Sequence, residues 1–325
     1  MIRQIKLIEL FGGIGSPRKA LERLKIPFES IDYVEIDKYV VKSYNAMYEE
    51  NYEPQDVSKV HYKNINCDLL VHGSPCQDFS IAGKQAGGDK GSGTRSSLLY
   101  ESVRIIKETD PNVVIWENVK NVLSKKHKGN FDNYLTEMSN LGYVNYYQVL
   151  NSKDYDVPQN RERVITVSIK RDLNKTFSFP KKQELKLRLK DVLEKNVDKK
   201  YYLSDRMKAY INSYDKKYKV CDTRLVLNRT IASCISTRTG QNRADSSDYI
   251  CKDLPENINI AGVDLAKYNI RKLTPKECFR LMGYDDSDFD KAVKVNSNTQ
   301  LYKQAGNSIV VNVLEEVFKQ LYKQL

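Results

Sequence analysis

The sequence predicts an α/β protein with a doubly wound parallel sheet and a smaller inserted domain. Over the first 170 residues, short apolar segments typical of strands alternate with segments typical of helices, which is the pattern of a sheet covered by helices on both faces. From about residue 176 the alternation gives way to short β-like pieces between polar loops, and helical patterns resume at Thr274. We therefore expect a main domain of residues 1–175 plus 270–325, and a smaller, mostly β or irregular domain of residues 176–269 inserted before the C-terminal helices.

The elements of the main domain follow from local apolar patterns and from the residues that end them. The expected strands are short apolar runs at 5–10, 30–35, 69–72, 113–116, 143–150 and 164–169. The expected helices cover about 17–25, 38–50, 97–108 and 130–141, followed late in the chain by 274–282 and 308–322. Pro111 and Gly142 fit the ends of the third and fourth helices.

Composition limits the class of protein. The formal net charge is +11, from 53 Lys and Arg against 42 Asp and Glu, which fits either a polyanionic partner or solubility alone. No run approaches the roughly 20 apolar residues of a membrane span, and the first apolar run ends at Glu9, too early for a signal peptide. Six cysteines without a C-x-x-C pair, and only three histidines, favour neither a metal site nor a disulfide framework, so we expect a cytoplasmic protein without metal.

The first expected strand runs into a glycine-rich turn, Phe11-Gly12-Gly13-Ile14-Gly15, ahead of a helix. Glycines let the backbone approach a ligand closely, and Glu35, twenty residues further on, is placed to accept hydrogen bonds from ribose hydroxyls. On this spacing alone the segment could be a fingerprint for NAD. Arg18 stands where the third glycine of that fingerprint would be, so the turn indicates a nucleotide-like ligand without a strong pyrophosphate site.

A single cysteine, Cys76, follows the third expected strand in a Ser-Pro turn. Ligands of open α/β sheets bind at the carboxyl ends of strands, so Cys76 is placed as a nucleophile, although a half-buried structural thiol is the alternative. The Gly-rich stretch 82–95 has the composition of a lid or of an ordinary surface loop. The fourth strand ends in Glu117-Asn118, and Arg163 enters the sixth strand either as an ion pair or as a substrate anchor.

In this order and at these spacings, the segments resemble the DNA cytosine-5 methyltransferases. The matching motifs are Phe11–Gly15, Glu35, Asp56, Pro75-Cys76-Gln77, Glu117-Asn118-Val119, Gln159–Arg163, 271–284 and 304–310. The resemblance covers roughly residues 1–170 and 270–325, and it fades over 180–270. Ala82 departs from the small polar residue that some relatives carry after the cysteine motif.

The resemblance implies the fold and reaction of that family. The sheet would be the Rossmann-like sheet of S-adenosylmethionine-dependent methyltransferases. The cofactor would be S-adenosylmethionine, with S-adenosylhomocysteine as product and no metal. The substrate would be a flipped-out cytosine in a specific short sequence of double-stranded DNA, methylated at C5 through an adduct between Cys76 and C6.

The resemblance also implies site residues. The catalytic set is Cys76, Glu117, Asn118, Arg161 and Arg163. The cofactor-binding set is Phe11, Gly12, Gly13, Gly15, Glu35, Ile36, Asp56, Val57, Pro75, Leu98, Asn307 and Ser308. The DNA-binding set is Gln77, Ser80, Arg95, Cys234, Arg238, Gln241 and Arg243, where Cys234 begins the pair that supports the flipped nucleotide and 238–243 holds base readers or phosphate contacts.

Three other functions stay open at this stage. A tRNA cytosine-5 methyltransferase would share the architecture, but its Cys-Phe-Thr triplet is absent, because Cys278-Phe279 is followed by Arg280. A catalytically inactive DNA-binding relative and an NAD oxidoreductase are the others. For the favoured function we expect a monomer that belongs to a restriction–modification system, with an endonuclease that acts on the same site without binding it, or an orphan or phage enzyme.

Overall fold

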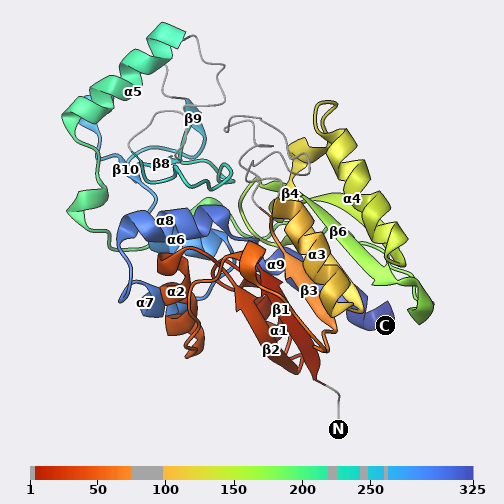
Figure 1. Cartoon of the computed structure of the whole chain (residues 1–325). Helices are drawn as coiled ribbons and strands as arrows, with labels where there is room; N and C mark the ends of the chain where they lie inside the picture. Colours follow the sequence, from red (N-terminus) through yellow and green to blue (C-terminus); the bar gives the residue numbers. More distant parts are fainter. Residues whose placement is uncertain (1–3, 75–97, 219–225, 242–247, 260–262, 325) are drawn as a thin grey trace. The chain divides into compact units, whose positions relative to one another are not determined.

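The computed structural model describes residues 4–74, 98–218, 226–241, 248–259 and 263–324 (Figure 1). The chain forms two compact units. The first consists of Met1–Asn151, Glu162–Lys182 and Val311–Leu325, and the second of Ser152–Arg161 and Gln183–Val310.

The first unit contains a six-stranded sheet. Its strands are β1 (Ile5–Leu10), β2 (Phe28–Val34), β3 (Leu69–His72), β4 (Val113–Val119), β5 (Tyr143–Asn151) and β6 (Glu162–Lys170), in the order β2-β1-β3-β4-β6-β5. The pairs β1–β2, β1–β3 and β3–β4 are parallel. All six strands lie where the sequence predicts them, with ends that differ by at most three residues.

The predicted α/β fold class is confirmed, but one strand departs from the predicted parallel arrangement: β6 runs antiparallel to both β4 and β5. Only residues 152–161 separate β5 from β6, and their regular structure is a 3₁₀ turn at Ser152–Tyr155. A parallel connection needs a crossover of a dozen or more residues, usually with a helix, so this short segment can only return the chain antiparallel.

The described residues of the first unit form five α-helices: α1 (Ser16–Arg23), α2 (Lys38–Tyr48), α3 (Leu99–Thr109), α4 (Lys128–Asn140) and α9 (Val311–Gln324). Asp37 caps α2, since its Oδ1 accepts a hydrogen bond from the Tyr39 N–H at 2.8 Å. The last helix packs against α1, and an ion pair of 2.8 Å joins Arg23 Nε to Glu315 Oε1. The final segment of the chain thereby covers the first βα unit.

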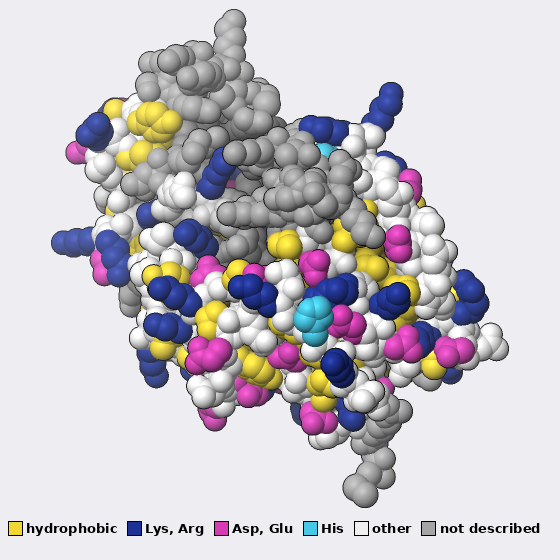
Figure 2. All heavy atoms as spheres, viewed as in Figure 1, with side chains coloured by type: hydrophobic (Ala, Val, Ile, Leu, Met, Phe, Trp, Pro, Cys, Tyr) yellow, Lys and Arg dark blue, Asp and Glu magenta, His cyan; other side chains and the backbone are white. Residues whose placement is uncertain are grey.

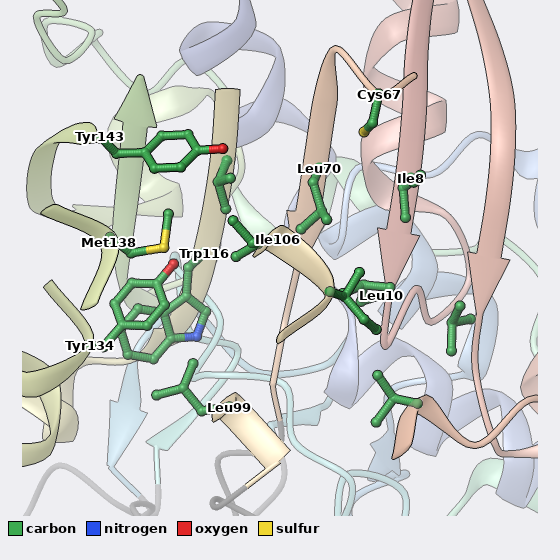
Figure 3. Close-up of a cluster of buried hydrophobic side chains, with 14 of the residues drawn as sticks. Ile8, Leu10, Cys67, Leu70, Leu99, Ile106, Trp116, Tyr134, Met138 and Tyr143 are labelled. Carbon is green, nitrogen blue, oxygen red and sulfur yellow. The ribbon is translucent and has the colours of Figure 1, made fainter. Parts of the chain in front are cut away.

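Buried side chains from the strands, α3 and α4 fill the core of the first unit (Figure 3). Trp116, on β4, is 1% exposed, and its ring centroid lies 4.4 Å from that of Tyr134 on α4. Leu70 and Ile8 are fully buried on the neighbouring strands. Strands buried on both faces read as near-continuous apolar runs, which is why the sequence located them well.

The second unit has a smaller, four-stranded sheet and four helices among its described residues. The strands are β7 (Val226–Leu227), β8 (Tyr249–Ile250), β9 (Ile258–Asn259) and β10 (Arg271–Lys272), in the order β10-β8-β7-β9. The helices are α5 (Asp205–Tyr218), α6 (Pro275–Leu281), α7 (Asp286–Ala292) and α8 (Asn298–Asn307). The predicted short β pieces are present, whereas α5, α7 and α8 were not predicted. Leu203, Met207 and Ile211 are buried at helical spacing, a signal that could have identified α5.

Residues 270–310 belong to the same compact unit as the inserted segment, whereas the sequence analysis placed them in the main domain. Compactness does not test which residues bind cofactor or DNA, so the functional division into 1–175 plus 270–325 and 176–269 stays a prediction. Within the described part of the chain, no helix is both long and apolar enough to cross a membrane. The described His, Cys, Asp and Glu side chains form no group of three or more that could hold a metal ion.

Candidate active site

The turn between β1 and α1 has a backbone that depends on glycine. Phe11, Gly13 and Gly15 all have positive φ, and Gly15, at 76°, is the residue that begins α1. A methyl group on Gly15 would lie 2.6 Å from the ring of Tyr48. Both the left-handed backbone and the close approach of this ring therefore require glycine at that position.

A group of tyrosines, which was not predicted from the sequence, supports this turn through hydrogen bonds and ring contacts. The Tyr33 hydroxyl donates to the carbonyl of Gly13 at 2.7 Å, and the Tyr48 hydroxyl lies 3.0 Å from the carbonyl of Gly15. The rings of Tyr33 and Tyr44 stack with centroids 3.7 Å apart. Tyr44 in turn donates to the buried carboxyl of Glu9 at 2.9 Å, and burial raises the pKa of Glu9 to about 7. The spacing of Tyr44 and Tyr48 on one face of α2 is the signal that could have found them.

The end of β2 places an acidic and an apolar side chain next to the turn. Glu35 Oε2 accepts a hydrogen bond from the Gly13 N–H at 3.2 Å, and Oε1 accepts one from the Asp37 N–H at 2.9 Å. Burial raises the pKa of the Glu35 carboxyl, while these two N–H donors favour its charged form. The Ile36 side chain is 67% exposed, although it is apolar. Lone pairs of Glu35 for ribose hydroxyls, beside an exposed apolar side chain for a base, fit a nucleoside-bearing cofactor.

The other predicted cofactor residues of the first unit contribute in different ways. Asp56 Oδ1 accepts hydrogen bonds from the N–H and hydroxyl of Ser58, at 3.0 and 2.8 Å, and these bonds lower the pKa of Asp56. The Val57 side chain is only 4% exposed, so only its backbone could meet a ligand. Leu98 packs half-buried against the core at the start of α3. Pro75 lies outside the described residues.

The segment that leads to the predicted nucleophile is held by two side chains of β4. Ser74 follows β3, and its hydroxyl accepts a hydrogen bond from Trp116 Nε1 at 3.1 Å. Asn118 Nδ2 donates to the Ser74 carbonyl at 3.3 Å. The side chains of Trp116 and Asn118 therefore converge on Ser74, and the Trp116 contact was not predicted. Cys76 lies outside the described residues, as do Gln77, Ser80 and Arg95.

Glu117 and Arg163 form an ion pair at the same end of β4. Arg163 Nε lies 3.0 Å from Glu117 Oε1, and their side chains are 19% and 11% exposed, respectively. A methyl group added to Gly73 would lie 3.9 Å from Glu117 Oε2, so the carboxyl reaches the segment after β3. A largely buried carboxylate, paired with a guanidinium and adjacent to Gly73, can present hydrogen-bonding groups to a polar ring.

In the second unit, Arg161 is 3% exposed and donates to backbone carbonyls from two distant segments. Nη1 donates to the Ile235 carbonyl at 2.7 Å, and Nη2 donates to the carbonyls of Gly306 and Ser308 at 3.1 and 2.8 Å. Cys234 Sγ is 3.5 Å from Nη1. Arg161 thus cross-links the chain around residues 235 and 306–308. Its predicted catalytic role stays a prediction.

Gln159, which the sequence analysis placed in a motif but not in the site, also anchors Ile235. Its side chain accepts a hydrogen bond from the Ile235 N–H at 2.9 Å and donates to the Leu281 carbonyl at 2.6 Å. Gln159 is fully buried. The side chains of Gln159 and Arg161 therefore both hold backbone groups.

The predicted DNA-reading residues of the second unit lie on a tight turn. Cys234, Arg238 and Gln241 are exposed, and the Ser236 N–H donates to Thr239 Oγ1 at 2.9 Å across the turn. Arg243 lies outside the described residues. Of the two late cofactor candidates, Asn307 is exposed, whereas Ser308 is buried and donates to the Gln304 carbonyl at 2.7 Å.

Charge on the visible face does not form a single patch. Figure 2 shows Lys and Arg side chains interspersed with Asp and Glu among the described residues on that face. The chain has a net charge of +11, but its basic side chains do not form one continuous basic surface for DNA among the described residues in this view.

A glycine-rich turn after the first strand and an acidic residue after the second define the nucleotide-cofactor class of α/β enzymes. The model of the C-5 cytosine-specific DNA methylase family matches residues 5–323. The chain belongs to this family and is a DNA (cytosine-5) methyltransferase. The predicted enzyme class is confirmed, and the tRNA and NAD-dependent alternatives are not retained.

Named relatives support the same assignment. The chain is 35% identical over 381 residues to the type II methyltransferase M2.ScrFI of Lactococcus lactis subsp. cremoris, covering 98% of this chain and 99% of the relative. It is 34% identical over 329 residues to the type II methyltransferase M.HhaI of Haemophilus parahaemolyticus, covering 96% and 93%. Among solved structures, the methyltransferase EhMeth of Entamoeba histolytica superimposes with a TM-score of 0.81 at 19% identity, covering 99% and 98%, which confirms the fold.

Proposed function

We propose that this methyltransferase, of the restriction–modification type, methylates C5 of a flipped-out cytosine in a short double-stranded DNA sequence through a covalent bond between Cys76 and C6. The observation that carries the proposal is the pair of Glu117 and Arg163, 3.0 Å apart beside the segment that leads to Cys76. A paired carboxylate and guanidinium match a pyrimidine edge that offers a ring nitrogen, an amine and a carbonyl.

S-adenosylmethionine is the cofactor we propose for the first unit. Glu35 would bind its ribose, Ile36 and Phe11 its base, and the N–H groups of the turn before α1 its carboxylate. Hydrogen bonds from Tyr33 and Tyr48 hold the backbone of the turn, which limits the ordering that binding requires. When bound, S-adenosylmethionine supplies an electrophilic methyl group.

The residues around the base would carry the covalent steps. Attack of the Cys76 thiolate on C6 breaks the C5–C6 double bond and makes C5 nucleophilic, after which C5 takes up the methyl group. Loss of the C5 proton and expulsion of the thiolate then restore the aromatic ring and release 5-methylcytosine. Glu117 would hold N3 and the exocyclic amine, and Arg163 would hold O2, as charge develops on the ring.

Three of the other cysteines are poor candidates for the nucleophile. Among the described residues, Cys67, Cys251 and Cys278 are buried. Burial raises the pKa of Cys67 to about 12, and it also raises the pKa of Cys251 and Cys278. Thiols with raised pKa values are poorly ionised at neutral pH and are therefore inert.

The remaining parts of the proposal concern partners. Since a stacked base exposes neither face of C6, the cytosine must leave the duplex, at a cost of about a few kcal/mol. The turn that carries Arg238 and Gln241 would read neighbouring bases. We propose that the enzyme acts as a monomer and protects the site of an endonuclease that it does not bind.

Covalent trapping tests the proposal. Wild-type protein and Cys76→Ser are incubated with S-adenosylmethionine and a duplex that carries 5-fluorocytosine at the methylated site, first mapped by bisulfite sequencing. Fluorine blocks the final elimination, so wild-type protein should form a denaturation-resistant complex that peptide mass spectrometry assigns to Cys76, and Cys76→Ser should not. A duplex with ordinary cytosine is the control. An adduct on Cys67 or Cys278 would overturn the assignment.

A further inference from the structure

The second unit contains a pocket of about 150 Å³ that no step of the proposed reaction uses. The 3₁₀ turn Lys199–Tyr201, residues 237–241, β10 and the start of α8 provide its walls. Its polar lining includes Lys200, Thr237, Thr239, Gln241, Lys272 and Asn298. No Asp or Glu is found among the described residues that line it. A water molecule occupies about 30 Å³ of liquid volume, so the pocket has room for a tetrahedral anion.

Lys272 is the ammonium group in this pocket that most needs an anion. It is half-buried, and its Nζ donates to the Gly240 carbonyl at 2.7 Å and lies 5.9 Å from the centre of the Tyr302 ring. No carboxylate lies within ion-pair distance of Lys272 in the described part of the chain. Burial accordingly lowers the pKa of Lys272. A bound anion would supply the missing countercharge.

The positive end of α8 opens on the same pocket. Asn298 and Thr299 are the first two residues of this ten-residue helix, and both line the pocket. The preceding residue, Ser297, makes no side-chain hydrogen bond to the first turn. The first N–H groups of a helix have no partner within the helix, and together with the helix dipole they favour a negative charge. Lys272 and α8 thus provide two independent attractions for an anion.

The turn proposed to read DNA also lines part of this pocket. A methyl group on Gly240 would lie 2.4 Å from the Tyr302 ring, so the turn rests directly on this ring. Lys272 holds the Gly240 carbonyl, and Gln241 both lines the pocket and is exposed. An anion held here would therefore fix the position of exposed Arg238 and Gln241.

We propose that this pocket binds a phosphate group of the DNA backbone and thereby sets the position of the 237–241 turn. The proposal rests on the proposed function, because it takes DNA as the partner. A free phosphate ion has the same chemistry as a ligand. The backbone phosphate is favoured because the pocket adjoins exposed Arg238 and Gln241 in a DNA methyltransferase whose net charge is +11.

The salt dependence of DNA binding tests the proposal. Fluorescence anisotropy of the full-length chain would give binding constants for cognate and unrelated duplexes between about 50 and 200 mM salt, the range over which phosphate contacts are lost. Lys272→Met should make the slope of log K against log salt shallower by about 0.9, equally for both duplexes, because one phosphate contact is removed. Lys276→Met is the matched control: Lys276 pairs with Asp286 and Asp290, does not line the pocket, and should leave the slope unchanged.

The outcomes separate the possible ligands. A folded Lys272→Met protein with the wild-type slope, or an equal loss in Lys276→Met, would overturn the proposal. A second combination of results would also overturn it: inorganic phosphate raises the melting temperature of wild-type protein but not of Lys272→Met, while the salt slope of DNA binding is the same in both. The site would then bind the free ion rather than a DNA phosphate. If Lys272→Met does not fold, Lys200→Met, which changes a more exposed lysine, provides the same measurement. Failure of the trapping experiment would refute the proposed function without altering these slopes.

Discussion

Replacement of the two arginines of one short motif, Arg161 and Arg163, should have different effects. Replacement of Arg161 should lower stability, whereas replacement of Arg163 should lower the rate of methylation. Arg161 is 3% exposed and donates to the carbonyls of Ile235, Gly306 and Ser308. A hydrogen bond that involves a charged group contributes about 1.5–3 kcal/mol, but three bonds to one guanidinium are not additive. Arg161→Met leaves three buried carbonyls without this donor, and we expect it to lower the free energy of unfolding by about 3 kcal/mol.

Arg163 has a different environment. It is more exposed than Arg161, and its partner is the Glu117 side chain rather than backbone. Because Gln can still donate a hydrogen bond to the Glu117 carboxyl, Arg163→Gln should lose much less stability than Arg161→Met. If Arg163 holds cytosine O2, as proposed, the same change should lower kcat by about 100-fold, the loss typical of a removed donor to developing charge.

Urea unfolding and single-turnover methylation distinguish the two variants. Circular dichroism follows both units, whereas the fluorescence of Trp116, the single tryptophan, follows the first unit. Arg161→Met should lower the urea midpoint seen by circular dichroism. Arg163→Gln should change neither urea midpoint appreciably, while the rate of methylation falls. A stable Arg161→Met protein, or an Arg163→Gln protein with wild-type kcat, would refute the reasoning.

Three further predictions concern the first unit. Burial raises the pKa of Glu9 from 4.5 to about 7, so the folded state binds more protons than the unfolded state between these pH values. The free energy of unfolding of the wild-type protein should therefore fall by about 3 kcal/mol as pH rises through this range. Glu9→Gln should abolish this decline in urea midpoints, and a persistent decline would contradict the prediction. Trp116→Phe removes the donor to the Ser74 hydroxyl and should cost about 1 kcal/mol of stability, while Ser74→Ala in the Phe background should add almost nothing if the two groups act only on each other. Glu35→Ala should weaken S-adenosylmethionine binding by about 1–3 kcal/mol in calorimetry, and wild-type affinity would remove Glu35 from the site.

The sequence predicted the first unit better than the second for a physical reason. Strands such as β3 are buried on both faces and appear as unbroken apolar runs, so burial and local sequence agree. The direction of β6 was missed because it depends on the length of its connection to β5, not on its own composition. Leu203, just before α5, and Met207 and Ile211 within it stand among lysines and tyrosines, which hid the helical spacing.

Some of the predicted site residues contact one another, while their roles stay predictions. Glu35 does contact the glycine turn, and Glu117 does meet Arg163. The supports were missed because tyrosines, a tryptophan and a serine are ordinary core or turn residues until partners distant in sequence are known. Tyr33 acts on Gly13, and Trp116 on Ser74, contacts that no local pattern indicates.

The hydrogen bonds of Arg161 have a consequence for how such an enzyme diversifies. Arg161 and Gln159 hold Ile235 through its backbone carbonyl and N–H, groups that every residue type except proline possesses. Substitutions among the exposed side chains that follow, such as Arg238, leave these bonds in place. Sequence change in this exposed turn is therefore uncoupled from the hydrogen bonds that hold Ile235. If the turn reads bases, as proposed, new target sequences could arise without any change in Arg161 or Gln159.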